Sequence, residues 1–336
     1  MNRGWLAPLT PLYAAAVAWR NRRIESGAEP VRRLAWPVVS IGNLSTGGAG
    51  KTPLTIALAR ALRERGFQVD VLSRGYGRSS RSAARVLADG TAEQFGDEPL
   101  EIAQAAGVPV WVARERYEAG LLAEAQGDTE AVPRVHLLDD GFQHRQLARD
   151  ADILLLSARD LGDRPLPAGN LREPLRNLQR ATVIAVDAGE PEVERFLRQA
   201  IPADHNSKAA RWAGPVWRLR RRMEIPSVSG PALAFCGIAR PEQFFAGLES
   251  GGLRLAARCA FADHRRYTAR DLERLAAKAR AAGATALVTT EKDRARLGAL
   301  VAALPETLSL VTARLTVEIE DEGAALNWLV NHLRPA

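Results

Sequence analysis

Cysteine is scarce in this chain, which has 336 residues but only Cys236 and Cys259. The sequence contains no C-x-x-C pair and no cysteine and histidine spacing typical of a zinc site. A disulfide framework and a zinc-based fold are therefore excluded, and the low cysteine content fits a reducing compartment such as the cytosol.

Long apolar runs are also lacking. The most apolar stretch, Trp5–Trp19, is too short to span a bilayer. Pro8 and Pro11 would break its first half, so we expect a helix that begins with Thr10 as N-cap and ends near Arg23. The prolines inside the apolar part also argue against a secretory signal peptide.

The basic flank Arg20–Arg23 suggests where this N-terminal helix lies. Three of its four residues are arginine, which would be attracted to anionic lipid headgroups. Residues 1–27 are therefore predicted to form a helix at a membrane surface, and packing of the helix on its own domain is the alternative. The side chains expected to enter the lipid are Leu12, Val17 and Trp19.

The overall charge is positive, with 46 Lys and Arg against 39 Asp and Glu and a net charge of +7. This excess indicates either a solvated arginine-rich surface or attraction to anions such as a nucleotide or an acidic lipid. Neither an RNA-type aromatic motif nor a helix-turn-helix pattern accompanies it, so we expect no nucleic-acid partner.

A phosphate-binding loop is predicted between Pro37 and Gly66. An apolar strand, Val38–Ile41, precedes a glycine-rich loop that ends in Gly50-Lys51-Thr52, where an amphipathic helix begins. Amides of such a loop and the positive helix end bind nucleotide phosphates. The pattern G-x-x-x-x-G-K-[ST] has glycine where this chain has Ser45.

Two residues at the end of this loop have specific expected roles. Lys51 would reach the β- and γ-phosphate oxygens of a nucleotide, and the Thr52 hydroxyl would bind Mg²⁺. The residues predicted to contact the nucleotide, which the family resemblance given below identifies as ATP, are Ser45, Thr46, Gly47, Gly48, Ala49, Gly50, Lys51 and Thr52.

Two further strand ends carry polar residues. Gln68–Leu72 is followed by the sequence SRGYGR, whose Arg74 and Tyr76 suit a loop at the ligand edge of a parallel sheet, or else a plain turn. The apolar run from Val135 ends in Asp139 and Asp140, which are predicted to bind Mg²⁺ or to form a turn.

Asp97 opens a helix in the sequence GDEP and allows two interpretations. It could be the N-cap of that helix. Alternatively, its carboxylate could face the site and take a proton from an attacking hydroxyl.

The order of the predicted elements gives the fold class and the domains. We expect an α/β protein with a P-loop-type parallel sheet domain and a second, smaller α/β domain whose strands begin after Pro231. The expected boundaries are 1–27 for the surface helix, 28–215 for the P-loop domain, 216–230 for a basic linker or strand, and 231–336 for the smaller domain.

Several motifs together resemble those of the tetraacyldisaccharide 4′-kinases of lipid A synthesis. The first four are GNLSTGGAGKTP, SRGYGR, GDEP and DDGFQHR, and the others are LPAGNLREP, FCGIARPEQFF, FADH and TTEKD. They follow one another over nearly the whole chain. Ser45 also matches the form that the loop takes in this family.

The resemblance implies transfer of the γ-phosphate of ATP to the 4′-hydroxyl of an acylated disaccharide 1-phosphate, which forms lipid IVA. It implies a peripheral enzyme on the cytoplasmic face of the bacterial inner membrane, with Mg²⁺ as cofactor. Asp97 matches the family's proposed base and His264 the histidine that works with it, with Lys51 as a third catalytic residue. Asp139 and Asp140 would serve magnesium. The remaining expected site residues are Arg74, Tyr76, Gln143, Arg172 and Glu173.

Two other functions stay open on the residues alone. A membrane-associated regulatory P-loop NTPase is the main alternative, although Asp187-Ala188-Gly189 stands where a GTPase would carry its guanine-reading N-K-x-D. A basic ATPase stimulated by nucleic acid is the second. Whether ATP consumption requires a glycolipid acceptor distinguishes them from the kinase.

Overall fold

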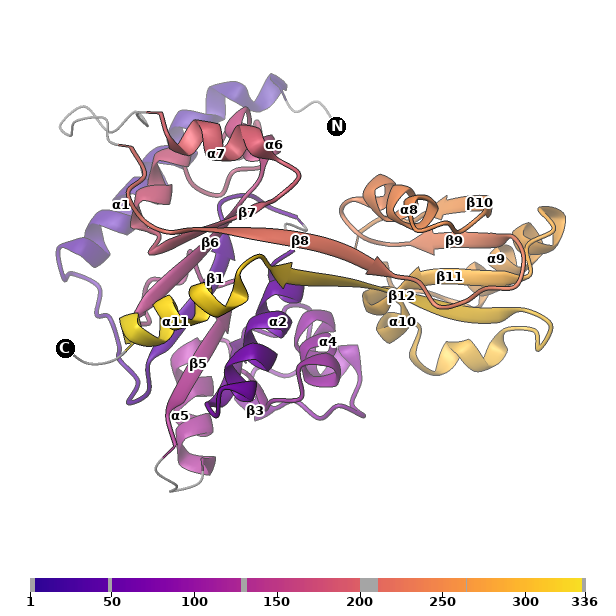
Figure 1. Cartoon of the computed structure of the whole chain (residues 1–336), viewed down its shortest axis with the longest axis horizontal. Helices are drawn as coiled ribbons and strands as arrows, with labels where there is room; N and C mark the ends of the chain where they lie inside the picture. Colours follow the sequence, from indigo (N-terminus) through magenta and orange to yellow (C-terminus); the bar gives the residue numbers. More distant parts are fainter. Residues whose placement is uncertain (1–3, 48–49, 128–131, 200–210, 264, 334–336) are drawn as a thin grey trace.

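The computed structural model describes residues 4–47, 50–127, 132–199, 211–263 and 265–333, arranged as two lobes joined by a pair of long strands (Figure 1). One 12-stranded sheet runs through both lobes in the order β10-β9-β11-β12-β8-β7-β6-β1-β5-β2-β4-β3. The α/β class and the parallel sheet that follow from the sequence pattern are therefore present.

The larger lobe contains the N-terminal part of the chain. Its strands are β1 (Val38–Asn43), β2 (Gln68–Ser73), β3 (Ala84–Arg85), β4 (Val110–Val112), β5 (Arg134–Asp139), β6 (Ala151–Leu156) and β7 (Val183–Asp187). Its helices are η1 (Gly4–Leu9), α1 (Thr10–Glu25), α2 (Lys51–Glu64), α3 (Ala92–Phe95), α4 (Asp97–Ala106), α5 (Arg116–Gln126), α6 (Ala158–Leu161), η2 (Leu175–Arg180) and α7 (Pro191–Leu197).

The smaller lobe and the connecting strands use the rest of the chain. The smaller lobe holds β9 (Ala232–Cys236), α8 (Pro241–Ser250), β10 (Leu255–Ala260), α9 (Ala269–Ala281), β11 (Ala286–Thr290), α10 (Glu291–Leu297) and η3 (Gly298–Ala303). The connecting strands are β8 (Val216–Glu224) and β12 (Ser309–Ile319), and α11 (Glu322–Leu333) ends the described chain.

The position of β1 in the sheet explains where the functional loops meet. β1 lies between β5 and β6 and is parallel to both, with Ile41 paired to Asp139. Every residue of β1 is buried, as expected for a strand covered by helices on both faces. A Cβ on Gly42 would lie only 2.6 Å from the Cβ of Phe142, so glycine allows the chain after β5 to approach β1 closely.

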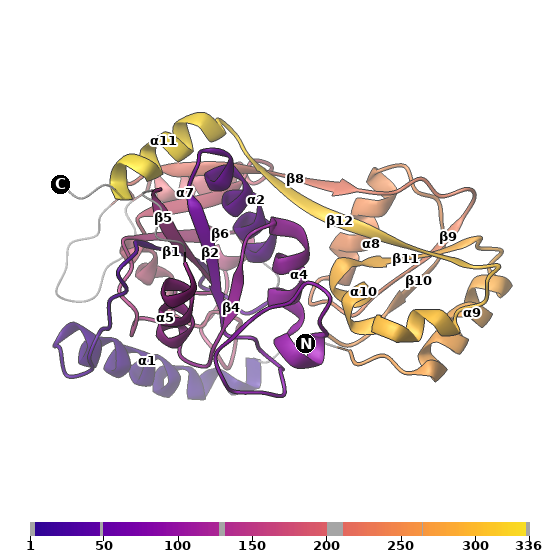
Figure 2. The same ribbon diagram turned by 90° about the horizontal axis from the view of Figure 1, so that it is seen from below.

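The basic segment predicted as a linker is mostly a strand. β8 pairs in parallel with β7 of the larger lobe and then antiparallel with β12, which in turn pairs with β11 of the smaller lobe. Figure 2 shows β8 and β12 crossing between the lobes side by side. Of the two predictions for residues 216–230, a linker or a strand, the strand is therefore observed for Val216–Glu224, and its backbone hydrogen bonds continue the sheet between the lobes.

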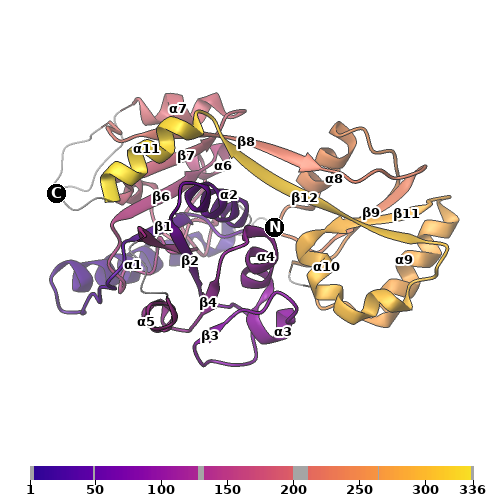
Figure 3. The same cartoon turned by 60° about the horizontal axis from the view of Figure 1, so that its bottom comes forward.

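The C-terminal helix corrects the predicted boundary of the smaller domain. β12 carries the chain back to the larger lobe, where α11 packs near α2 (Figure 3). Leu326 and Leu329 are buried in the same apolar core as Val39 and Leu58. The last residues thus belong to the larger lobe, because their apolar face covers its sheet.

The N-terminal helix differs from its prediction in two respects. Thr10 is its first residue and Leu9 occupies the cap position, with no side-chain cap. Val17 is buried, so the expectation that it enters lipid is wrong, whereas Leu12 and Trp19 are 70% and 61% exposed. In the part of the chain that the structure describes, no helix combines the length and apolar character that crossing a membrane requires.

Leu329→Ala should destabilise the larger lobe, because it removes a fully buried side chain from the main core. We expect the free energy of unfolding to fall by about 2 to 5 kcal/mol, measured by urea denaturation. Asn331→Ala, at an exposed position of the same helix, is the matched control. An equal and small effect of both substitutions would mean that α11 does not belong to this core.

Candidate active site

The start of α2 has the geometry of a phosphate-binding loop. Gly50 adopts a left-handed conformation with φ of 89°, and α2 begins at Lys51 immediately after it. The Lys51 ammonium donates to Asn43 Oδ1 at 3.0 Å and lies 3.4 Å from Asp140 Oδ1. Gly48 and Ala49, both predicted to contact ATP, lie outside the described residues.

Ser45 fits its position because the backbone there does not need a positive φ. Its hydroxyl accepts a hydrogen bond from Asn43 Nδ2 at 3.2 Å. The next amide, of Thr46, donates to the carbonyl of Asn170 at 2.8 Å. The first part of the loop is thus held against the segment around Asn170, and a glycine is not required at position 45.

The two aspartates after β5 have different surroundings. Asp139 is buried and accepts a hydrogen bond from Thr55 Oγ1 at 3.2 Å. Asp140 receives Nη1 of Arg172 on both carboxylate oxygens, each at 2.9 Å. Arg172 also donates to Gln143 at 3.2 Å, and Gln143 donates to the carbonyl of Asn43 at 2.9 Å, which links this cluster to β1.

These surroundings separate the acidities of the two aspartates. Burial, together with the nearby carboxylates of Glu98 and Asp140, raises the pKa of Asp139 to about 7. Burial also works against ionisation of Asp140, but the ammonium of Lys51 and the guanidinium of Arg172 outweigh it and lower its pKa. One carboxyl of the pair therefore keeps its negative charge more readily than the other.

A cavity of about 1370 Å³ lies between the lobes and contains these groups. From the larger lobe it is lined by Thr46, Gly47, Gly50, Lys51, Thr52, Arg74, Tyr76, Glu98, Glu101, Arg116, Asp139, Asp140, Gln143 and Arg172. The smaller lobe and the connecting strands add Arg221, Met223, Ile238, Arg240, Phe244, Lys292 and Arg296. Most of the predicted site residues thus meet around one space.

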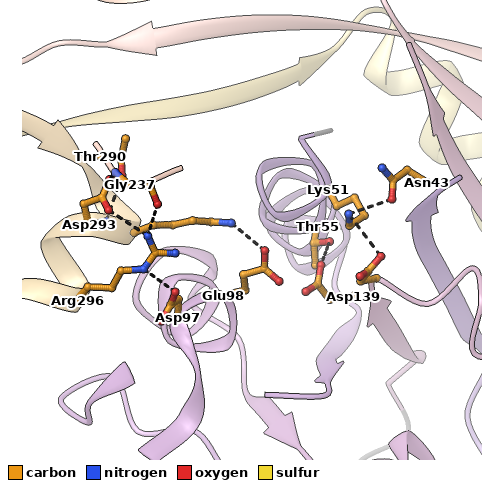
Figure 4. Close-up of polar contacts among 12 residues, drawn as sticks. Asn43, Lys51, Thr55, Asp97, Glu98, Asp139, Gly237, Thr290, Asp293 and Arg296 are labelled. Carbon is orange, nitrogen blue, oxygen red and sulfur yellow. Dashed lines mark hydrogen bonds and ion pairs between the residues drawn. The ribbon is translucent and has the colours of Figure 1, made fainter. Parts of the chain in front are cut away.

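Asp97 is placed at the contact between the lobes. It is the first residue of α4, and Gly96 occupies the cap position without a side-chain cap, so the capping interpretation is excluded. Its Oδ2 accepts a hydrogen bond from Arg296 Nε of α10 at 2.6 Å, and Figure 4 shows the two side chains pointing toward each other. His264, the predicted partner of Asp97, lies outside the described residues.

Glu173 does not line the cavity, although it was expected among the site residues. Its carboxylate is completely buried and contacts Arg180 at 2.8 Å and Asn177 at 2.6 Å. From α1, Asn21 and Arg20 approach it at 3.5 and 3.8 Å. Glu173 therefore ties the N-terminal helix to the loop that carries Arg172.

Several cavity residues could not be assigned from the sequence. Glu98 accepts a hydrogen bond from Lys292 Nζ at 2.8 Å, which makes a second contact between α4 and α10. Burial lowers the pKa of Arg116 to about 10. Arg221 was expected to be solvated, but it faces the cavity and pairs with Asp187 at 3.0 Å. The alternation of apolar and basic residues in β8 could have predicted this, because Arg221 lies on the same face of the strand as the buried Trp217 and Leu219.

Glu101 is a buried acid one turn after Glu98 on α4. It is 8% exposed, and its Oε2 has no hydrogen-bond partner among the described residues. Burial raises its pKa to about 7, and the positive charge of Lys292 only partly offsets this effect.

Comparisons with a family model and with individual relatives give the same family for this chain. The family model for tetraacyldisaccharide-1-P 4′-kinase matches residues 3–334. The tetraacyldisaccharide 4′-kinase of Koribacter versatilis is 43% identical over 334 residues, which cover 96% of this chain and 97% of the relative. That of Geobacter sulfurreducens is 40% identical over 309 residues, covering 89% and 85%.

A solved structure is similar over the whole length. It is the "apo" form of LpxK from Aquifex aeolicus in complex with ATP, with a TM-score of 0.75 and 30% sequence identity. The match covers 99% of this chain and 100% of that one.

Glu101→Gln should stabilise the protein at high pH. A raised carboxyl pKa means that the folded protein holds the proton more tightly than the unfolded chain, so stability is lost as the pH rises from about 4.5 toward 7. The amide carries no charge, so at pH 8 the variant should gain about 1 to 3 kcal/mol in free energy of unfolding.

This comparison uses urea unfolding of the nucleotide-free protein at pH 4 and pH 8. At pH 4 both proteins should agree to within about 0.5 kcal/mol, since the carboxyl is largely protonated in either state. Glu64→Gln, at an exposed helix position, is the control. A gain that is the same at both pH values would show that ionisation of Glu101 does not cause it.

Proposed function

Because the chain belongs to the tetraacyldisaccharide-1-phosphate 4′-kinase family and is an ATP-dependent kinase of lipid A synthesis, we propose roles for the individual residues of its cavity. The enzyme transfers the γ-phosphate of ATP to the 4′-hydroxyl of the acylated disaccharide 1-phosphate. The observation that carries the proposal is that the phosphate loop and the Asp139–Asp140 pair line one cavity together with Arg296, which contacts Asp97. The regulatory NTPase and the nucleic-acid-stimulated ATPase are set aside by this family membership.

The loop at the start of α2 binds the phosphates of ATP. Backbone amides at a helix N-terminus favour anions, and Lys51 adds a full positive charge where negative charge accumulates on the transferred group. Lys51 contacts Asn43 and Asp140, which hold its ammonium at the mouth of the loop. Positioning and charge stabilisation of this kind account for most of the catalysis of phosphoryl transfer.

Thr52, Asp139 and Asp140 would hold Mg²⁺. Oxygen donors from one hydroxyl and two carboxylates suit this ion, which in kinases takes one or two carboxylates together with phosphate oxygens. Among the described residues, no group of three or more acidic, histidine or cysteine side chains is placed to hold a metal ion. Bound there, Mg²⁺ would supply charge neutralisation for the phosphates.

Asp97 accepts the proton of the attacking 4′-hydroxyl. Its carboxylate lies at the first turn of α4, next in sequence to the cavity-lining Glu98, and is held in place by an arginine from the other lobe. Transfer of the proton to this carboxylate makes the sugar oxygen a better nucleophile as its bond to phosphorus forms. Arg74 and Tyr76, in the loop after β2, line the same cavity.

The helix α1 holds the enzyme at the cytoplasmic face of the membrane. Leu12, Trp19 and Arg23 share one exposed face of the helix, while Val17 and Ile24 bury the other face in the protein. An exposed apolar face flanked by arginines is the arrangement that binds an anionic lipid surface. The acylated acceptor would meet the cavity from that surface.

Asp97→Asn should leave ATP binding intact and lower kcat by about 10²- to 10⁴-fold, since the amide cannot take the proton. Turnover is measured as transfer of labelled phosphate from ATP to the disaccharide 1-phosphate, and ATP affinity by calorimetry. Lys51→Ala should impair both quantities, because it removes charge that contacts the phosphates. Full turnover of the Asp97 variant would remove this residue from the mechanism.

The triple substitution of Trp5, Leu12 and Trp19 by serine should weaken binding to vesicles that contain anionic lipid. These side chains are exposed, so their loss should not alter the packing of α1 on the larger lobe. Co-flotation with the vesicles and kcat on a detergent-dispersed acceptor are measured together. Leu87→Ser and Leu121→Ser, exposed apolar positions elsewhere, are the controls. Undiminished flotation of the triple variant would place the membrane contact on another surface.

A further inference from the structure

Arg296 connects the smaller lobe to Asp97. It lies on α10, and its side chain is only 5% exposed. Nη1 donates to the carbonyl of Gly237 at 2.6 Å and to Asp293 Oδ1 at 3.0 Å, both within the smaller lobe. Nε donates across the interlobe contact to Asp97 Oδ2 at 2.6 Å (Figure 4). The guanidinium is therefore fixed on one side and directed at the carboxylate on the other.

The groups that fix Arg296 are themselves buried. Asp293 has no exposed surface and accepts hydrogen bonds from the Gly237 amide at 3.0 Å, Tyr267 Oη at 3.0 Å and Thr290 Oγ1 at 2.7 Å. These donors come from the loop after β9, from the segment before α9 and from the end of β11. A buried hub with partners from three elements leaves the arginine little freedom to turn away.

A second pair between α4 and α10 keeps the two helices in register. Lys292 lies four residues before Arg296, one helical turn away, and its ammonium donates to Glu98 at 2.8 Å. Two adjacent acids of α4 thus meet two cations that are one turn apart on α10. The smaller lobe can be displaced from this contact only if both pairs break.

We propose that Arg296 is a positioning residue for the kinase reaction, carried by the smaller lobe, and that it orients the Asp97 carboxylate for proton transfer. This inference rests on the role of Asp97 proposed above. A charge-assisted hydrogen bond from a fixed guanidinium restricts the orientation of the carboxylate and favours its ionised form, which is the form that can accept a proton. The contact of α10 with α4 thereby completes the base.

Arg296→Gln should lower kcat by about 10²-fold, the usual cost of a misplaced catalytic group, and leave the KM for ATP unchanged. Arg296→Lys keeps the positive charge but loses the planar guanidinium. Its kcat should therefore lie between those of the glutamine variant and the parent enzyme. The acidic limb of the kcat profile should move to higher pH by about 1 to 3 pH units in the glutamine variant, because a neighbouring cation no longer favours the ionised base. Among the described residues, charged groups near this contact include Glu98, Glu101, Lys292, Asp293 and Asp263.

A double-mutant cycle separates positioning from structural support. In the Asp97→Asn background, Arg296→Gln should cause little further loss of kcat, because the arginine acts through the missing carboxylate. Tyr267→Phe removes another contact of Asp293 and should lower the unfolding midpoint without moving the pH profile. Arg258→Gln, which breaks a surface pair with Glu249 in the same lobe, controls for loss of an arginine.

The outcomes that overturn the inference are distinct from those that overturn the role of Asp97. Equal losses from Arg296→Gln in both backgrounds would make the arginine structural, and an increase in kcat would make it an inhibitory latch. If Arg296→Gln does not fold, Arg296→Lys is measured in its place. A kcat and a pH profile equal to those of the parent enzyme would then refute the positioning role. Full activity of Asp97→Asn would instead refute the base.

Discussion

The parallel pairing of β1 with β5 is the constraint on which the site depends. Pairing Ile41 with Asp139 sets the end of the phosphate loop strand beside the end of the strand that carries two aspartates. The carboxyl ends of parallel strands face the same edge, so a cation at the start of α2 and carboxylates after β5 must meet there. Gly42 allows the two segments to approach more closely than any side chain would permit.

Bringing so many charges together is costly, and the structure offsets the cost differently at each group. Asp140 stays ionised because Lys51 and Arg172 contact it, whereas Asp139 accepts a hydrogen bond from the uncharged Thr55 hydroxyl and holds its proton to higher pH. A nucleotide phosphate and its cation would change this balance, since they add charge at the point where one aspartate is only partly ionised. Acids whose pKa values are separated in this way, beside a lysine in a cavity, are typical of a site that acts on a charged ligand.

The sequence predicted the elements that carry local signals and missed those that depend on tertiary contacts. The phosphate loop, the strand before Asp139 and the β-α series after Pro231 follow from periodicity and glycine placement, and the kinase family follows from the motifs. The return of α11 to the larger lobe could not be predicted, because its burial depends on β12 crossing back between the lobes. Likewise, spacing in the sequence gives no reason for Arg296 to reach Asp97, 199 positions away. Glu173 shows the reverse case, since a motif residue expected in the site is instead a buried structural acid.

The buried position of Glu173 also bears on how the N-terminal helix should be understood. Arg20 and Asn21 of α1 approach its carboxylate, and Tyr13 of the same helix donates to the carbonyl of Arg172 at 3.0 Å. Removing α1 would expose this cluster and leave a carboxylate without part of its surroundings, a change that commonly costs several kcal/mol. Because Arg172 in turn holds Asp140, the damage would extend to the cavity. A deletion would therefore confound anchoring with folding, and only substitutions on the exposed face of the helix can separate the two.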